Sequence, residues 1–360
     1  MSRQPNAASR ALVVGATGIA GQTTARHLVE NGWTTFGLTR RGETPEPRVE
    51  YLTADLLDPG SLEAVVAGTA PELVVITAWM RRDSEQANIE ANSAIVRNLL
   101  MALEPERTVR HVALLTGLKH YLGPFEAYGR GVMADTPFHE YEPRQSSPNF
   151  YYAQEDELFE SSARNGFTWS VHRAHSILGF AVGNAMNMVL TLGVYATLCR
   201  ELGLPFIFPG SATQWNGVND VTDADLLADQ IIWAATDPRG ANEAFNVVNG
   251  DVFRWRWLWP RIARMLEVEP DGFDTEPRPL AHRMRGMESE WRRIARKHGL
   301  VEHDINRLAS WWHTDSDLGR DVESFADMGK SREAGFLAAR STESSFAEKL
   351  TQYRAAGILP

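Results

Sequence analysis

The sequence has 360 residues, 43% of them hydrophobic and 23% charged, so it can bury a large core and is not typical of a disordered chain. Its formal net charge of −10 argues against a nucleic-acid partner, because binding to phosphates needs a basic face. The single cysteine, Cys199, excludes an intrachain disulfide and fits a reducing compartment.

Short apolar runs alternate with longer amphipathic ones over the first 175 residues. We expect strands at 11–14, 35–38, 73–76, 112–115 and 168–171, and helices at about 18–31, 83–103 and 151–165. This alternation predicts βαβ units, and the near-continuous apolar strands predict a parallel sheet with helices on both faces. A further helix is expected at 223–236 and a late strand at 245–248. The predicted class is α/β, with a doubly wound parallel sheet.

No membrane span is expected. The longest apolar stretch, 185–198, is shorter than the roughly 20 residues that a spanning helix needs. The first ten residues are polar and lack the apolar core of a signal peptide. We therefore expect a cytoplasmic protein, with Cys199 as a small buried apolar residue.

A glycine-rich segment, GATGIAG, follows the first predicted strand and opens the first helix. Its spacing lets the backbone turn tightly and approach a pyrophosphate at the positive end of a helix. The segment therefore predicts a dinucleotide site, and a simple turn is the alternative. The expected contacts are Gly15, Thr17, Gly18, Ile19 and Gly21.

The end of the second predicted strand indicates which dinucleotide binds. An NAD site places Asp or Glu about 20 residues past the glycines, where it binds the ribose hydroxyls. Here the strand ends in Thr39-Arg40-Arg41, and guanidinium groups suit a 2′-phosphate. This favours NADPH/NADP⁺, and a solvated basic turn is the alternative. Further cofactor contacts are expected at the ends of later strands: Asp55, Leu56, Thr77, Ala78, Trp79 and Thr116.

The last hundred residues are rich in tryptophan and in helical patterns, which predicts a smaller, mainly helical region beside the sheet. We assign residues 1–178 plus about 211–250 to an NADP-binding Rossmann domain. Residues of about 179–210 and 251–360 are then a substrate-binding region.

The candidate catalytic residues depart from the usual pattern of short-chain dehydrogenases, in which a lysine follows the tyrosine by four residues. Glu155 and Asp156 stand at that spacing from Tyr151 and Tyr152. The lysine nearby in the sequence is Lys119, which follows the fifth predicted strand. Because ligands bind at the carboxyl ends of strands in a doubly wound sheet, we expect Lys119 to take the place of the missing cation.

Longer segments have a more specific pattern than the glycine loop. They are TGLKHYLGPFE at 116–126, NFYYAQED at 149–156, WSVHR at 169–173, NEAFNV at 242–247, NGDVF at 249–253 and GFL at 335–337. Together they resemble the progesterone 5β-reductase/iridoid synthase-like enone reductases, a family of extended short-chain dehydrogenases/reductases. The resemblance spans nearly the whole chain from about Arg10.

That resemblance implies an NADPH-dependent reductase of the conjugated C=C of enones, acting on CH–CH donors. In that family the catalytic tyrosine and lysine come from separate motifs, and Tyr151 and Lys119 occupy those positions here. Negative charge grows on the carbonyl oxygen during 1,4-addition, so donors must lie there. We expect Tyr151 to face that oxygen and Lys119 to tune it, since an ammonium lowers a phenol pKa from about 10. The α-carbon proton could come from Tyr151 or from water.

The resemblance also places Phe125 and a residue after the paired tryptophans in the substrate pocket. Family members best known for steroids have Phe at the second position, whereas this sequence has His313, which favours a small or medium enone. Tyr121 and Tyr152 are expected to line the pocket or to be structural. A homodimer is also suggested. No pair of histidines has metal-ligand spacing, so no metal is expected.

Two other functions compete with enone reduction. A carbonyl reductase would use the same fold, cofactor and residue pair but add hydride to the carbonyl carbon. An NADP-sensing regulator would bind the dinucleotide without turnover, and the presence of Lys119 and Tyr151 argues against it.

Overall fold

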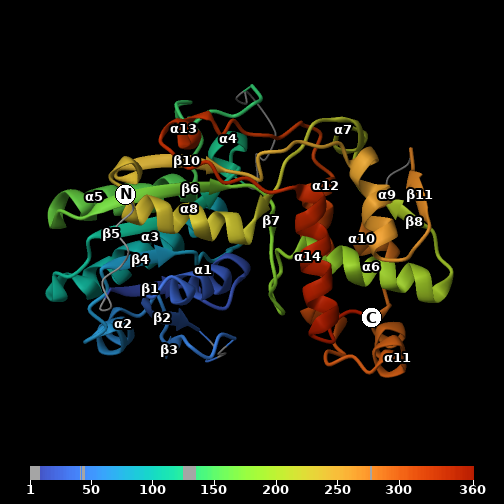
Figure 1. Cartoon of the computed structure of the whole chain (residues 1–360), viewed down its shortest axis with the longest axis horizontal. Coiled ribbons are helices and arrows are strands. Elements are labelled where there is room, and N and C mark those ends of the chain that lie inside the picture. Colours follow the sequence, from blue (N-terminus) through green and yellow to red (C-terminus); the bar gives the residue numbers. More distant parts are fainter. Residues whose placement is uncertain (1–8, 41, 43–44, 125–134, 276–277) are drawn as a thin grey trace. The chain divides into compact units, whose positions relative to one another are not determined.

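The computed structural model describes residues 9–40, 42, 45–124, 135–275 and 278–360 of the chain (Figure 1). These residues belong to two compact units. The first comprises Met1–His175, Ala224–Val247 and Asp327–Ala338, and the second comprises Ser176–Asp223, Val248–Ala326 and Ala339–Pro360.

The first unit is built on a seven-stranded sheet in the order β10-β6-β5-β4-β1-β2-β3 (Figure 1). Its strands are β1 (Arg10–Val14), β2 (Thr34–Thr39), β3 (Glu50–Thr53), β4 (Leu73–Ile76), β5 (His111–Gly117), β6 (Thr168–Ala174) and β10 (Glu243–Val247). All neighbouring strands in this sheet pair in parallel. The strand order reverses between β1 and β4, which is where such sheets bind ligands. The predicted fold class is confirmed.

Helices cover both faces of this sheet. The right-handed crossovers from β1 to β2 and from β4 to β5 run in opposite directions, so their helices lie on opposite faces. On one face α1 (Ile19–Glu30) packs against α8 (Ala224–Thr236). On the other, α3 (Glu85–Leu103) packs against both α2 (Pro59–Val66) and α5 (Phe150–Asn165). Two short helices complete the unit, α4 (Lys119–Leu122) and α13 (Gly329–Glu333).

The second unit is mainly helical, as the sequence predicts. Its helices are α6 (Met188–Leu202), α7 (Ala212–Asn216), α9 (Trp255–Met265), α10 (Leu280–Arg283), α11 (Glu288–His298), α12 (Trp311–Leu318) and α14 (Thr342–Ala355). Two small strand pairs accompany them, β8 (Phe206–Phe208) with β11 (Pro270–Phe273) and β7 (Ile177–Leu178) with β9 (Thr222–Asp223).

The core of the second unit forms around α6, which is buried along most of its length. Trp259 is fully buried there, and its indole N–H donates to the carbonyl of Phe206 at 3.1 Å. Cys199 is buried in the same cluster, as expected, and burial raises the pKa of its thiol to about 12. Among the described residues, no helix has the length and hydropathy of a membrane span.

The unit boundaries differ from the predicted domains in two longer segments, and by three residues each at 176–178 and 248–250. Residues 211–223 were predicted with the sheet, but they belong to the second unit, where Asn219 and Phe253 exchange two backbone hydrogen bonds of 2.8 and 2.9 Å. Residues 327–338 were predicted with the helical region but belong to the first unit. There Lys330 donates to the carbonyl of Ala244 at 2.9 Å, and Phe336 packs on a ring of α8.

Candidate active site

The glycine loop lies at the point where the strand order reverses. Gly15 follows β1 with a φ of +84°, a conformation that favours glycine. A Cβ added at Gly21 would lie 2.2 Å from the carbonyl oxygen of Gly15, so only glycine fits there. Thr77, which follows β4, donates to the carbonyl of Val14 at 2.8 Å. The predicted contacts Gly15, Gly21 and Thr77 are therefore brought together.

The start of α1 fits a phosphate group. The helix begins at Ile19, after Gly18, with no side chain capping its first turn and no acidic residue in that turn. Helix N-termini have backbone N–H groups without intrahelical partners and a partial positive charge, both of which favour anions. Thr17 and Gly18 are half-buried in this turn, beside the backbone of Gly15. These residues fit a pyrophosphate.

The other predicted cofactor residues lie at the ends of neighbouring strands. Thr39 is buried at the end of β2, Arg40 is exposed beside it, and Arg41 lies outside the described residues. Asp55 is exposed after β3, and its carboxylate accepts the N–H of Leu57 at 2.9 Å. Thr116 is buried in β5, and its hydroxyl has no hydrogen-bond partner among the described residues. Leu56 and Ala78 are half-buried.

Lys119 and Tyr151 come together at the carboxyl end of β5. The Lys119 Nζ lies 5.6 Å from the centre of the Tyr151 ring, although 32 positions separate the two residues along the chain. A Cβ added at Gly117, the last residue of β5, would lie 3.6 Å from the Tyr151 hydroxyl oxygen. The phenol of Tyr151 is therefore at the sheet edge where doubly wound folds bind ligands.

Aromatic rings from two other positions surround the ammonium of Lys119. Its Nζ lies 5.7 Å from the centre of the Trp79 ring and 6.0 Å from that of Phe150. These two rings stack on each other at 5.3 Å. Cation–π attraction at such distances stabilises an ammonium by about 0.5–2 kcal/mol. Trp79, predicted as a cofactor contact, is thus also a neighbour of Lys119.

One buried asparagine joins the backbones of the two candidate catalytic residues. Asn149 is the N-cap of α5, and its side-chain oxygen accepts the N–H of Tyr151 at 3.0 Å. Its side-chain nitrogen donates to the carbonyl of Lys119 at 2.7 Å. Sequence reasoning found Asn149 only as part of a family motif. Its position before a helix, as an N-cap residue type, is a signal that could have identified it.

The position that carries lysine in common short-chain dehydrogenases has a different role here. Glu155 is buried, and burial raises the pKa of its carboxyl group. One of its oxygens accepts from Arg144 at 2.8 Å, and the other lies 3.9 Å from His120 Nδ1. Glu155 therefore binds Arg144, and its second oxygen faces the His120 ring of α4.

Tyr121 and Tyr152 are structural in this arrangement. The Tyr121 hydroxyl donates to the side chain of Asn246 at 2.6 Å, and the Tyr152 hydroxyl donates to the carbonyl of His120 at 2.7 Å. Burial raises the pKa of Tyr121 to about 12. Because both phenols are buried and engaged, the structural alternative is favoured over pocket lining.

Two further residues, Phe125 and His313, are predicted to line the substrate pocket. Phe125 lies outside the described residues. His313 is half-buried in α12 of the second unit, with its ring edge-on to Trp312 at 5.5 Å.

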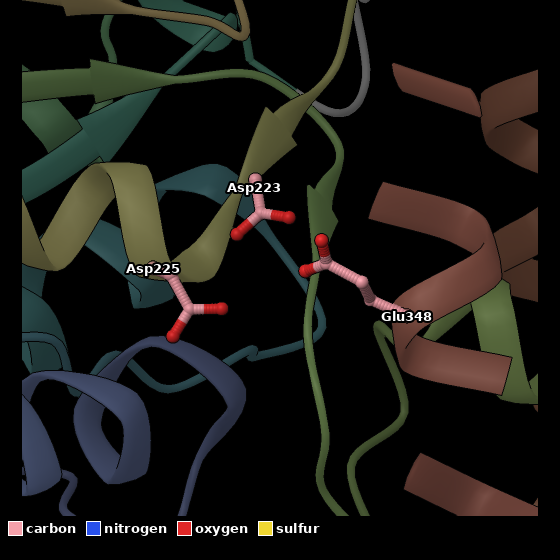
Figure 2. A group of neighbouring side chains, drawn as sticks. All are labelled: Asp223, Asp225 and Glu348. Carbon is pink, nitrogen blue, oxygen red and sulfur yellow. The ribbon is translucent and has the colours of Figure 1, made fainter. Parts of the chain in front are cut away.

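Acidic side chains of β9, α8 and α14 are drawn in Figure 2, and each has cationic partners in its own unit. In the second unit, Asp223 lies 3.6 Å from Lys349, and Glu348 accepts from Arg340 at 3.1 Å. In the first, Asp225 accepts from Arg26 and His27. Each of these carboxylates is thus an ion-pair partner within its own unit.

Solved structures show which class of fold this is. UDP-glucose 4-epimerase from Thermotoga maritima matches with a TM-score of 0.69 at 16% identity, over 96% of this chain and 99% of that chain. The epimerase of Thermus thermophilus in complex with NAD matches with a TM-score of 0.67 at 16% identity, over 96% and 99%. At such identities the likeness shows the fold alone, which is a Rossmann fold.

Sequence comparison defines the family within that class. Residues 62–360 match the PRISE-like Rossmann-fold domain. A 3-oxo-Δ(4,5)-steroid 5-β-reductase of Arabidopsis thaliana is 39% identical, over 98% of this chain and 93% of that protein. An (S)-8-oxocitronellyl enol synthase of Camptotheca acuminata is 38% identical over the same shares. The chain belongs to the PRISE-like Rossmann-fold family, which confirms the resemblance found in the sequence.

Proposed function

We propose that the protein reduces the conjugated C=C of small or medium enones with NADPH. The proposal rests mainly on the proximity of the Lys119 Nζ to the Tyr151 ring, which are 5.6 Å apart beside the end of β5. Membership of a family whose relatives include a steroid 5-β-reductase supports it. His313, in place of the phenylalanine of the steroid-reducing members, favours the smaller substrates.

The cofactor would be held by the glycine loop and the adjoining strand ends. The first turn of α1 would bind the pyrophosphate, and Gly15, Gly21 and Thr77 give it room. Arg40 and Arg41 would bind the 2′-phosphate, and the buried Thr116 hydroxyl is available to the nicotinamide half. When bound there, NADPH supplies a hydride.

The role of the side chains is to stabilise charge on the substrate. During 1,4-addition, electron density moves from the C=C to the carbonyl oxygen, which becomes an enolate oxygen. The Tyr151 hydroxyl donates a hydrogen bond to that oxygen, and the Lys119 ammonium adds electrostatic stabilisation. A donor of this type contributes about 10²–10³-fold to the rate in comparable sites.

The product of one reaction tests the proposal. The enzyme is incubated with 2-cyclohexen-1-one and NADPH, and the products are separated by gas chromatography. Cyclohexanone is the expected product, whereas the allylic alcohol would identify a carbonyl reductase. With NADPH carrying deuterium at its transferable position, the label is expected at the β-carbon. If NADPH binds but no enone is reduced, an NADP-sensing function replaces the proposal.

Variants of the two residues test their roles. Tyr151→Phe and Lys119→Met are each expected to lower kcat by about 100-fold, since each removes one stabilising group. Tyr141→Phe is the matched control, because Tyr141 is 82% exposed and its ring packs only on His139 among the ring contacts of the described residues. A Tyr151→Phe enzyme as fast as the parent on every enone would remove Tyr151 from the mechanism.

The homodimer and the cytoplasmic location remain predictions of the sequence.

A further inference from the structure

Three buried polar side chains lie on one face of α3. Glu85 is 6% exposed, Asn88 2% and Asn92 0%. Their spacing of three and four residues places them on the same side of the helix, next to the apolar residues that pack on the sheet. A buried polar group destabilises a fold unless it is hydrogen-bonded, so each of these side chains requires a partner.

The two asparagines hold the segment that follows β4. Asn92 pairs with Met80 in both directions, since it accepts the Met80 N–H at 2.7 Å and donates to the Met80 carbonyl at 2.8 Å. One turn earlier, Asn88 accepts the N–H of Arg82 at 2.7 Å. The backbone on the carboxyl side of Trp79 is thereby fixed at two points.

Glu85 holds the start of α5. One of its carboxylate oxygens accepts the N–H of Phe150, the first residue of that helix, at 2.7 Å. Its other oxygen accepts from the side chain of Asn88 at 3.1 Å. A carboxylate is favourable at a helix N-terminus, because it satisfies a backbone N–H and interacts with the positive end of the helix dipole.

We propose that Glu85, supported by Asn88 and Asn92, is a positioning residue for the reduction. The network joins the two segments that carry the rings around Lys119. Trp79 comes from the segment held by the asparagines, and Phe150 from the helix start held by Glu85. The inference rests on the proposed function, because it assigns these residues to the placement of the ammonium and of the neighbouring phenol.

The positions of the rings explain how the loss of one hydrogen bond would affect catalysis. The Trp79 and Phe150 rings stack at 5.3 Å, and both lie within 6.0 Å of the Lys119 ammonium. If the Phe150 N–H loses its acceptor, the first turn of α5 can shift, and Tyr151 moves with it. A displacement of about 1 Å at a catalytic group can lower a rate by about 100-fold.

Three variants test this role with steady-state kinetics on 2-cyclohexen-1-one. Glu85→Leu is expected to lower kcat by about 10- to 100-fold while the KM for NADPH stays within about twofold. Glu85→Gln keeps an oxygen that can accept the Phe150 N–H but loses the acceptor for the Asn88 side chain, so its kcat is expected to fall less than that of Glu85→Leu, by about threefold to tenfold. Glu90→Leu removes the same charge from an exposed position of α3, where Glu90 accepts from Gln86, and is expected to match the parent.

Hydrogen exchange at the start of α5 provides a readout independent of turnover. The Phe150 amide is expected to exchange at least about tenfold faster in Glu85→Leu, and at nearly the parent rate in Glu85→Gln and Glu90→Leu. If Glu85→Leu does not fold, Asn88→Ala is the substitute variant. It removes the hydrogen bonds of Asn88 to the Glu85 carboxylate and to the Arg82 N–H, so it should produce the same changes more weakly.

Different outcomes separate the two proposals. A parent enzyme that reduces no enone would refute the proposed function, and the exchange rates would still decide whether Glu85 holds α5. Parent-like kcat and exchange in Glu85→Leu would overturn the positioning role. A loss in Glu85→Gln as large as in Glu85→Leu would also overturn it, because the acceptor of the Phe150 N–H would then not decide the effect.

Discussion

Replacing Asn149 should weaken both the fold and the catalysis, because its side chain bonds to the backbones of Tyr151 and Lys119 at 3.0 and 2.7 Å. Loss of an N-cap costs about 1 kcal/mol, and loss of one hydrogen bond to the Lys119 carbonyl, which still accepts the Gly123 N–H at 3.1 Å, costs about 0.5–1.5 kcal/mol. Asn149→Ala is therefore expected to lower the free energy of unfolding by about 1.5–2.5 kcal/mol. Its kcat is expected to fall by at least about tenfold, since the distance between the phenol and the ammonium is no longer held.

A second substitution at the same position separates the cap from the bridge. Asn149→Asp keeps a good acceptor for the Tyr151 N–H, but it places a carboxylate oxygen where the amide donated to Lys119. This variant should keep the α5 cap and still lose activity. Urea unfolding followed by circular dichroism gives the stability, and turnover of 2-cyclohexen-1-one gives kcat. An Asn149→Ala enzyme with parent stability and parent kcat would refute the bridging role.

Three further predictions concern the cofactor site and its supporting helix. Gly21→Ala places a Cβ 2.2 Å from the Gly15 carbonyl, so the KM for NADPH should rise at least about tenfold, whereas Gly60→Ala, whose Cβ meets nothing closer than 3.6 Å, should not change it. Arg40→Ala and Arg41→Ala should raise the KM for NADPH far more than that for NADH; equal effects on the two would remove the 2′-phosphate assignment. Burial disfavours charge on His27, but hydrogen bonds to Asp225 and Asp229 outweigh it and raise its pKa to about 9. Because a raised pKa stabilises the fold below the unfolded value of 6.5, that stability, about 2–3 kcal/mol, should be lost as pH rises through about 9. Urea unfolding at pH 6 and pH 10 should show this loss of stability in the parent but not in His27→Gln.

The sheet was predictable from sequence because its strands are almost continuously apolar. β4 has the bounds predicted for it, and β1, β2 and α3 differ by one or two residues at their ends. The glycine loop was also predictable, since its chemistry is contained in seven consecutive residues. Such local patterns predict the structure of a single segment of the chain.

The division into units was harder to predict, because it depends on contacts between distant segments. Residues 327–338 return to the first unit through contacts such as that of Lys330 with Ala244, which no local pattern reveals. The network on α3 was missed for a related reason. Glu85, Asn88 and Asn92 have the spacing of a solvated helix face, and only the fold shows that they are buried.

The pairing of Lys119 with Tyr151 was predicted from the family motifs, and the structure shows the two side chains together. Neither composition nor periodicity could have paired them, because 32 positions separate them. The sheet brings them together by placing the end of β5 beside the start of α5.

The central claim is that this pair acts beside the reactive ring of a bound dinucleotide. A crystal structure of the complex with NADP⁺ tests it most directly. We expect the nicotinamide ring to face the Tyr151 hydroxyl, with Lys119 near the adjoining ribose and the pyrophosphate on the first turn of α1. A nicotinamide bound away from both side chains would contradict the account.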